Sequence, residues 1–261
     1  VDLYTRALYN SNVYANKDLT IHRVLMKNPS GEGYIEVAAD IANSVLTANK
    51  TVDMVAGYVS NTNVYALSGI TAEVVKELSG GEWTADSGIL KVTAGTIEGA
   101  RLQISDGYIE IIADQMTGSS VTALDGASTP ATPKAGEALL IVDSISGSTI
   151  FSDNALEVNA ASDISTIGNS SLKSDLGDVT VNNVFTLDNV NISANKLITV
   201  AAANDAAGGS WVSYNGDLSI EVNYIDGVTM SAANGAAMGV GNVDLYTRAL
   251  YNSNVYANNV L

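Results

Sequence analysis

The sequence predicts an all-β protein whose short strands stack as a parallel β-solenoid. Apolar and polar residues alternate in many short runs, which is the periodicity of β-strands. The chain has 23 glycines and 3 prolines, so tight turns between short elements are expected to be frequent. Two turn–strand motifs also recur, and such units bury their apolar residues only when similar coils stack on them. One or more β-sandwich domains are the alternative, since regularly spaced short strands also form sandwiches.

The first motif is a glycine turn followed by a strand. In each copy, the apolar residue two positions after the glycine begins a run of period-two alternation. The four copies are residues 32–40, 87–95, 106–114 and 215–223. Gly88 and Gly107 are 19 residues apart. This spacing predicts coils of about 20 residues and about a dozen layers, stacked about 4.8 Å apart.

The second motif is a pair of short strands joined at an Ala–Asn corner. Asparagine suits a corner because its side chain bonds to nearby backbone and because it tolerates the left-handed conformation. The copies are residues 11–21, 62–70, 191–200 and 253–261.

Three segments depart from these motifs. Residues 68–81 place Ile70, Val74 and Leu78 on one helical face before two glycines, which predicts a short helix near residues 70–78, packed across the sheet. The range 118–137 holds two of the three prolines and is predicted to be an exposed loop or linker. Residues 201–210 are predicted to be another irregular excursion.

These departures divide the chain into four parts. A front solenoid portion covers residues 1–117 and a rear portion covers residues 138–242, with the loop 118–137 between them. The last part, residues 243–261, opens with the same sixteen residues as the chain itself.

Composition excludes several classes of function. The net charge is −16 with 12 basic residues, so no basic surface is expected for nucleic acid. There is no cysteine, which rules out disulfides, thiol catalysis and zinc–thiolate sites. No apolar run is long enough to span a bilayer. An acidic chain rich in Asn, Ser, Thr and Gly is typical of bacterial or archaeal surface and secreted proteins, so we expect an extracellular or cell-surface location.

The stretches NVYANKDLTI (residues 12–21) and NVNISANKLITV (residues 189–200) resemble the repeats of filamentous-haemagglutinin-type bacterial surface proteins. The resemblance covers about half of the chain and is one of repeat style. It implies right-handed parallel β-helices and a role in adhesion. The amino-terminal secretion domain of that family is not visible in this sequence.

Catalytic signatures are missing from the sequence, and we expect no enzymatic activity. His22 is the only histidine; it sits in the strand-like run DLTIHRVLM, beside Arg23, and no nucleophile-elbow sequence occurs elsewhere. A glycan-binding or glycan-cleaving β-helix of the tailspike or lyase type is the alternative. Its nearest approach to a site is Lys91, Arg101 and Asp106, without a paired-aspartate motif.

Calcium is the one cofactor that the sequence indicates. Asp106, Asp153, Asp175 and Asp178 lie beside predicted turns, where carboxylates and carbonyl oxygens could together bind calcium. None of these stretches matches an EF-hand loop or the glycine-rich nonapeptide of β-rolls. Ordinary solvated turns are the alternative interpretation.

The sequence VDLYTRALYNSNVYAN occurs twice without a change, at residues 1–16 and 243–258. Three explanations are open: a block of a longer repeating protein with a period of 242 residues, a strand-exchange device, and a local duplication without a role. Tyrosine and arginine suit interfaces. The expected assembly contacts are Tyr4, Arg6, Tyr9, Tyr14, Tyr246, Arg248, Tyr251 and Tyr256. Alternatively, the tyrosines line one face of a sheet internally.

Together these observations predict a structural protein that forms or belongs to a β-rich filament. Copies of the chain would join head to tail through their like ends, because an open β-stack needs its edges capped or paired. Adhesion or matrix building would be the use, with cell-surface glycans as a further partner. A surface-layer subunit is a third hypothesis.

Overall fold

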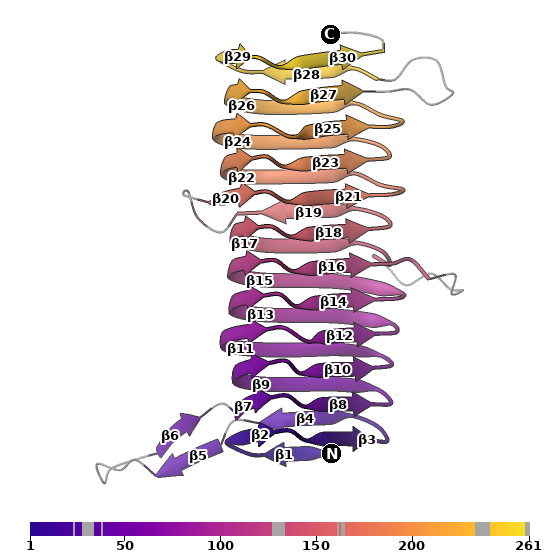
Figure 1. Cartoon of the computed structure of the whole chain (residues 1–261). Helices are drawn as coiled ribbons and strands as arrows, with labels where there is room; N and C mark the ends of the chain where they lie inside the picture. The colour runs from indigo at the N-terminus through magenta and orange to yellow at the C-terminus, as the bar shows by residue number, and fades with distance from the viewer. Residues whose placement is uncertain are drawn as a thin grey trace.

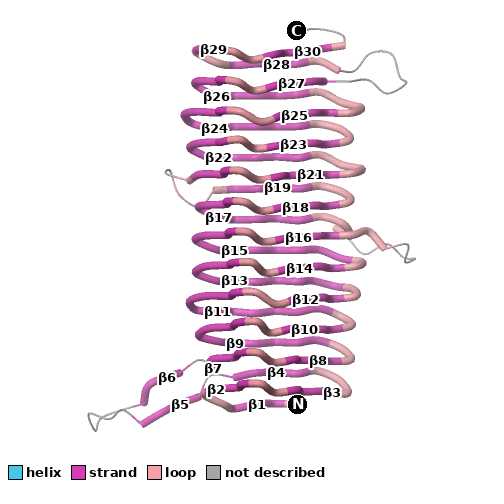
Figure 2. Tube along the Cα trace, in the orientation of Figure 1, coloured by secondary structure: helices cyan, strands magenta, loops and turns pink. Residues whose placement is uncertain are grey.

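The computed structural model describes residues 1–22, 24–27, 34–37, 39–126, 134–160, 162, 165–232 and 241–258. Every regular element in these ranges is a β-strand, and the strands stack as a parallel solenoid (Figures 1 and 2). The predicted fold class is therefore confirmed, and the β-sandwich alternative is excluded because consecutive coils pair in parallel.

Two parallel sheets run along the shaft (Figure 1). The 16-stranded sheet consists of β1 (Asp2–Tyr4), β2 (Ala7–Tyr9), β4 (Leu19–His22), β7 (Ala39–Ala42), β9 (Thr51–Ser60), β11 (Gly69–Ser79), β13 (Gly88–Glu98), β15 (Gly107–Thr117), β17 (Ala138–Ser146), β19 (Leu156–Asn159), β20 (Thr166–Gly168), β22 (Val179–Asp188), β24 (Ile198–Ala207), β26 (Leu218–Asp226), β28 (Val243–Tyr246) and β29 (Ala249–Tyr251). The 12-stranded sheet consists of β3 (Asn12–Ala15), β8 (Val45–Ala48), β10 (Asn63–Ala66), β12 (Glu82–Ala85), β14 (Arg101–Ile104), β16 (Ser120–Ala123), β18 (Thr149–Ser152), β21 (Ser171–Ser174), β23 (Asn191–Ala194), β25 (Ser210–Ser213), β27 (Thr229–Ala232) and β30 (Asn254–Ala257). An antiparallel hairpin of β5 (Val24–Lys27) and β6 (Tyr34–Val37) projects beside the first coils.

The core lies between the two sheets and runs the length of the shaft. Alternate residues of each strand point inward, as the period-two pattern predicted, and parallel pairing aligns them in columns. One such column joins Val64, Trp83 and Leu102 in register, and all three are fully buried. Small residues form the column beside it, as in Ala66 and Ala85. Small and branched side chains therefore fill most of the interior.

One corner of every coil has a left-handed residue, and at this corner the chain uses only asparagine or glycine. These residues are Asn10, Asn43, Asn61, Gly80, Gly99, Gly118, Gly147, Asn169, Asn189, Gly208, Gly227 and Asn252, with φ between 44° and 67°. Such values cost little only for these two residue types. The sequence placed left-handed asparagines at the Ala–Asn corner instead. That was wrong: Asn16, Asn49 and Asn195 are not among the described residues with positive φ.

The helix predicted near residues 70–78 is also wrong. Residues Gly69–Ser79 form strand β11, which pairs with β9 on one edge and β13 on the other. Ile70, Val74 and Leu78 are all buried, but a spacing of four fits a strand face as well as a helix face. A bulge between Val74 and Glu77 interrupts the alternation and adds to the helical appearance.

The two predicted irregular segments belong largely to the sheets. Within 118–137, strand β16 pairs with β14 and β18, while residues 127–133 lie outside the described part of the chain. Within 201–210, strand β24 continues to Ala207 and bulges between Ala202 and Asp205. Both sheets thus continue across ranges that the sequence marked as loops.

Candidate functional site

The duplicated sixteen residues build the two outermost coils of the shaft. Strands β1, β2 and β3 come from the first copy, and β28, β29 and β30 come from the second. Figure 1 places these two coils at opposite ends of the stack. The same sequence therefore folds in the same way at both ends, with each strand at the equivalent residues except that β28 begins one residue earlier than β1.

The two copies use opposite edges of that coil. In the first copy, Leu3 pairs with Ile21 of the following coil, and the other two strands pair with β7 and β8. In the second copy, Leu245 pairs with Ile220 of the preceding coil, and the other two strands pair with β26 and β27. Within the described residues, the remaining edge of each copy has no strand partner.

Backbone hydrogen bonds show this division at a single position. The carbonyl oxygen of Arg6 accepts from the N–H of Asp40 at 3.0 Å. At the equivalent position, the N–H of Arg248 donates to the carbonyl oxygen of Asn223 at 3.0 Å. Other positions bond in the opposite sense, since the N–H of Asn10 donates to Ala42 and the carbonyl oxygen of Tyr251 accepts from Gly227. Donors and acceptors thus alternate along each edge, as in any parallel pair, and the two copies together show both edges that an interior coil must pair.

A serine makes the same division with its side chain. The N–H of Ser11 donates to Ser44 Oγ at 3.2 Å, one coil further along. Its twin Ser253 accepts through Oγ from the N–H of Val228 at 3.1 Å, one coil back. Ser119 does both within the shaft, since its Oγ accepts from Ala100 and its N–H donates to Ser148 Oγ. Ser11 therefore makes the donor half of this serine contact at one end of the shaft, and Ser253 makes the acceptor half at the other end.

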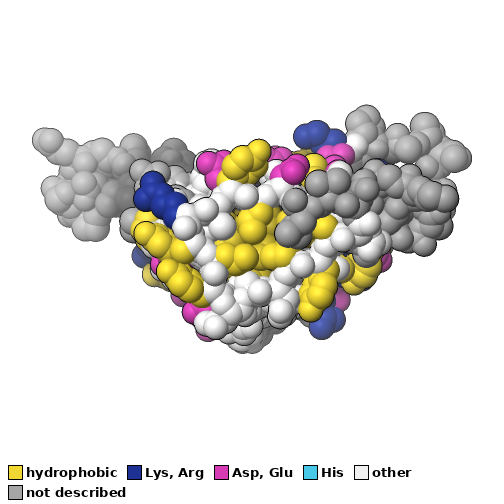
Figure 3. Space-filling view, turned by 90° about the horizontal axis from the view of Figure 1, so that it is seen from above, with side chains coloured by type: hydrophobic (Ala, Val, Ile, Leu, Met, Phe, Trp, Pro, Cys, Tyr) yellow, Lys and Arg dark blue, Asp and Glu magenta, His cyan; other side chains and the backbone are white. Residues whose placement is uncertain are grey.

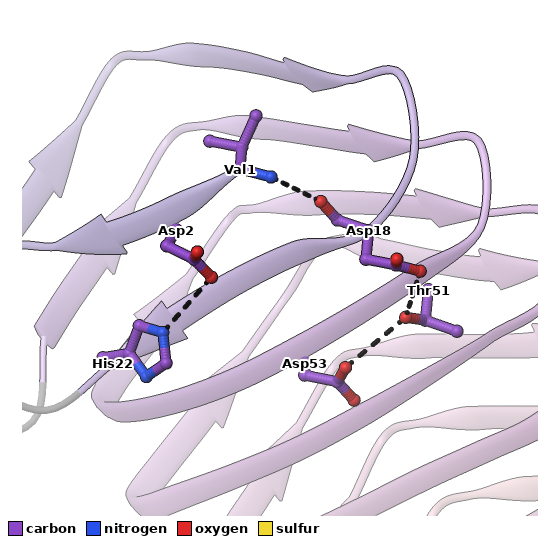
Figure 4. A network of polar contacts seen from close by, with 6 residues as sticks. All are labelled: Val1, Asp2, Asp18, His22, Thr51 and Asp53. Atoms are coloured by element: carbon purple, nitrogen blue, oxygen red, sulfur yellow. Dashed lines mark hydrogen bonds and ion pairs between the residues drawn. The ribbon is translucent and has the colours of Figure 1, made fainter.

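The first coil is attached to the next by a small polar network (Figure 4). The amino group of Val1 donates to the carbonyl oxygen of Asp18 at 2.7 Å. His22 Nε2 lies 3.4 Å from Asp2 Oδ1, and its ring stacks on Tyr4 with centroids 4.4 Å apart. Thr51 donates to Asp18 at 3.1 Å, and this hydrogen bond lowers the pKa of that carboxyl.

Apolar side chains at each end are only partly covered. Leu3, Leu8 and Val13 in the first coil are half-buried against the core, as are Leu245 and Val255 in the second. The twin of Leu8 is 40% exposed. Figure 3, which looks onto the β28–β30 end, shows hydrophobic side chains gathered at the centre of that end. The end coils therefore leave apolar surface where interior coils would cover it.

The predicted tyrosines lie on the outside of these coils. All six are between 54% and 71% exposed, which excludes an internal sheet face. They are Tyr4, Tyr9, Tyr14, Tyr246, Tyr251 and Tyr256. The hydroxyl of Tyr14 accepts from the side-chain amide of Asn49 at 2.8 Å. Arg6 and Arg248 are exposed beside them.

An open groove of about 480 Å³ lies beside the second copy. Tyr246 and Arg248 line it from the duplicated coil, and Asn183, Glu221 and Asn223 line it from the coils below. Aromatic, cationic and amide groups therefore face one hollow on the 16-stranded sheet. Sequence reasoning missed this groove because the bulges and coil pairings that shape it are not visible in a single segment.

The residues considered for glycan cleavage do not come together. Lys91 Nζ pairs with Glu110 at 2.6 Å on the 16-stranded sheet. Arg101 lies on the other sheet, with its guanidinium 3.9 Å from Glu82. Asp106 sits in the turn after that strand. Arg23, the neighbour of the single histidine, lies outside the described residues.

The candidate calcium residues are engaged with protein groups. Asp153 accepts from the N–H of Asp125 at 2.8 Å, and Asp178 accepts from the N–H of Leu197 at 3.0 Å. Asp175 pairs with a lysine at 2.7 Å, and the carbonyl of Asp106 accepts from a glycine N–H at 3.2 Å. Among the residues that the structure covers, no three acidic or histidine side chains are grouped to hold a metal. Calcium binding at these aspartates remains a prediction.

Comparisons with known proteins assign no family. No protein-family model matches the chain, and neither curated proteins nor solved structures gave a match. The resemblance to filamentous-haemagglutinin-type repeats agrees with the structure at the level of the β-solenoid and no further. None of the described residues forms a helix long and apolar enough to cross a membrane.

Proposed function

We propose that this protein is a structural component of an extracellular or cell-surface filament, in which β-solenoid shafts join head to tail and serve adhesion or matrix building. The protein would carry no catalytic site. Its function would lie in the rigid shaft, in the contacts between ends, and in the loops displayed along the sides.

One observation supports this proposal above the others: the same coil stands at both ends and uses opposite edges. A strand edge with free N–H and C=O groups is a template for pairing with another chain. A head-to-tail contact between unlike edges does not close on itself, so it extends into a filament. The half-buried leucines and valines at both ends add apolar surface that a joined copy would cover.

The acidic composition supports the location. A net charge of −16 in a chain rich in Asn, Ser, Thr and Gly is typical of surface and secreted proteins. The continuous core lets the shaft dispense with disulfides.

Negative-stain electron microscopy of the full chain at neutral pH tests the proposal. Long unbranched filaments would support it, and separate compact particles at high protein concentration would overturn it. A flat lattice would favour the surface-layer hypothesis instead. Leu3→Asp, which places a charge among the apolar residues of the first coil, should prevent filaments. Tyr214→Asp is the matched control, because this tyrosine is exposed on the side of the shaft.

Glycan binding is a second candidate function, favoured by the groove at Tyr246 and Arg248. An exposed aromatic ring beside amide and carboxylate groups can stack on a sugar and bond its hydroxyls. Tyr246→Ala should then weaken binding to a glycan array. Tyr4→Ala is the matched control, since the same tyrosine stacks on His22 at the other end. Equal loss, or no binding by the unaltered protein, would exclude the groove as a glycan site.

A further inference from the structure

We propose that copies join by coil substitution: strands β1–β3 of one copy take the place of β28–β30 on the edge formed by β26 and β27 of the next. This inference rests on the proposed filament and specifies its joint. The occupant is another molecule of this chain. Until it binds, residues 243–258 of the same molecule cover the edge of β26 and β27.

The fit of the incoming coil follows from identity of sequence. The edge of β26 and β27 already holds these sixteen residues, with Ser219 opposite Asp244, Ile225 opposite Leu250 and Ser231 opposite Tyr256. In the joint, Asp2, Leu8 and Tyr14 of the neighbouring molecule would take the places of Asp244, Leu250 and Tyr256. Every contact that the β26–β27 edge now makes with strands β28–β30 of its own chain would be made again with strands β1–β3 of the neighbouring molecule.

The opposite edge of the incoming coil is occupied as well. Residues 1–16 keep their pairing with β4, β7 and β8 of their own chain while they dock. Val228 would donate to Ser11 Oγ, as it now does to Ser253, and Ser11 would still donate to Ser44. The joint is then an interior coil with both edges bonded, and it contains no contact type that the structure does not already show.

Coil substitution moves apolar burial from the internal coil to the incoming coil. Leu250 is 40% exposed, and Ala257 is half-buried where its twin Ala15 is fully buried. In the joint, Leu8 and Val13 would have coils on both sides instead of one. The released coil loses an equivalent face, so exchange costs little in buried apolar area, and a rise in protein concentration should favour the joint by mass action.

Stacking one copy of the coil directly on the other is the competing geometry, and the charges disfavour it. In parallel register, Asp244 would lie on Asp2 and Arg248 on Arg6, about 4.8 Å apart. Like charges directly opposite one another destabilise a strand pair. In the substitution joint, Asp2 lies instead between Ser219 and Thr20.

The chain has no cysteine, so paired cysteines can report which geometry forms. Tyr14→Cys with Ser231→Cys places two outward-facing thiols opposite one another only in the substitution joint, at a Cα separation that suits a disulfide. Tyr14→Cys with Tyr256→Cys does so only when one coil stacks on the other. Tyr14→Cys with Thr229→Cys is the control, two residues out of register and about 8 Å apart.

A matched pair of charge substitutions tests the covering role of residues 243–258 in the full chain. Val255→Asp weakens the internal coil, and Val13→Asp places the same change in the incoming coil. Under the proposal, Val255→Asp should increase the disulfide-linked ladder of the Tyr14→Cys/Ser231→Cys protein several-fold, whereas Val13→Asp should abolish it. Leu250→Asp and Leu8→Asp form a second pair if circular dichroism shows that either valine variant has lost its β-structure.

The outcomes of these experiments test coil substitution separately from filament formation. Opposite effects of the two aspartates, with a ladder from the Ser231→Cys pair, support coil substitution. A ladder from the Tyr256→Cys pair alone overturns coil substitution and leaves the filament standing. Equal loss in both aspartate variants also overturns it. If neither pair links and electron microscopy shows only separate particles, both the joint and the proposed function fall.

Discussion

The indole nitrogen of Trp83 donates a hydrogen bond to the carbonyl oxygen of Thr62 at 3.0 Å, and this bond links two successive coils inside the core. Trp211 makes the same bond to Val190 at 3.1 Å. In both places two glycines and one polar residue precede the tryptophan. The motif Gly-Gly-x-Trp thus gives the solenoid a polar contact between coils within an otherwise apolar interior.

Replacing Trp83 by phenylalanine should destabilise the shaft. The side chain is fully buried, so the smaller ring leaves a cavity and the Thr62 carbonyl loses the indole donor. We expect a loss of about 2–4 kcal/mol in the free energy of unfolding. Urea unfolding followed by circular dichroism measures it. Thr84→Ala, one residue along and facing outward, is the control, and an equally large loss there would contradict this assignment.

Gly81→Ala should be more damaging than an ordinary left-handed substitution. The residue has φ +83°, and a Cβ would lie 2.2 Å from the carbonyl oxygen of Thr62, so the coils would have to separate. We expect the midpoint of thermal unfolding to fall by at least about 5 °C, or the protein to be insoluble. Gly99→Ala has φ +61° with open space around the Cβ, so its loss should be limited to backbone strain of about 1 kcal/mol.

The corner column makes a separate prediction about asparagine. Gly99 occupies the same left-handed position as Asn43, Asn61 and Asn189 in other coils. Gly99→Asn should therefore be tolerated better than Gly99→Ala, because asparagine adopts this conformation at lower cost. Thermal unfolding of both variants beside the unaltered chain measures the difference. A lower midpoint for the asparagine variant would show that the column selects for small size and not for conformation.

Tyr108 should limit stability at high pH. Burial, followed by the charges of Glu110, Glu137 and Glu157, raises the pKa of this phenol to about 12. In the unfolded chain the phenol ionises near its ordinary value of about 10. Its contribution is therefore complete below about pH 10 and is lost as the pH rises toward about 12. Tyr108→Phe should lose less stability over this interval than the unaltered chain, measured by urea unfolding at each pH.

The solenoid could be predicted because its cause is local and repeated. Alternation around Gly88 and Gly107 identifies strands, and a strand with one apolar face needs a neighbouring coil. The helix predicted at residues 70–78 was wrong because the deciding interactions there are not local. Ile70 and Val74 satisfy both periods, and only pairing with β9 and β13 decides between them. That pairing involves residues outside any local window.

Two further features, the left-handed corner column and the edges used by the end coils, also depend on residues far apart in the sequence and could not be predicted. The left-handed column is spread over positions 18 to 33 residues apart, because the number of residues from one corner to the next varies. Some of its positions hold asparagine and others glycine, so no single residue type marks it. The identity of residues 1–16 and 243–258 is plain in the sequence, but their opposite edges are not. An edge is set by the coil that precedes or follows, and only the assembled stack shows which one that is.

Salt should promote filament growth if the joint is apolar and backbone-paired as proposed. Each copy carries a net charge of −16, so approaching copies repel one another at low ionic strength. The screening length falls from about 30 Å at 0.01 M salt to about 8 Å at 0.15 M. We expect the rate of assembly, followed by light scattering, to rise on the order of tenfold across this range. A joint held by ion pairs through Arg6 and Arg248 would weaken instead, so a falling rate would contradict an apolar, backbone-paired contact.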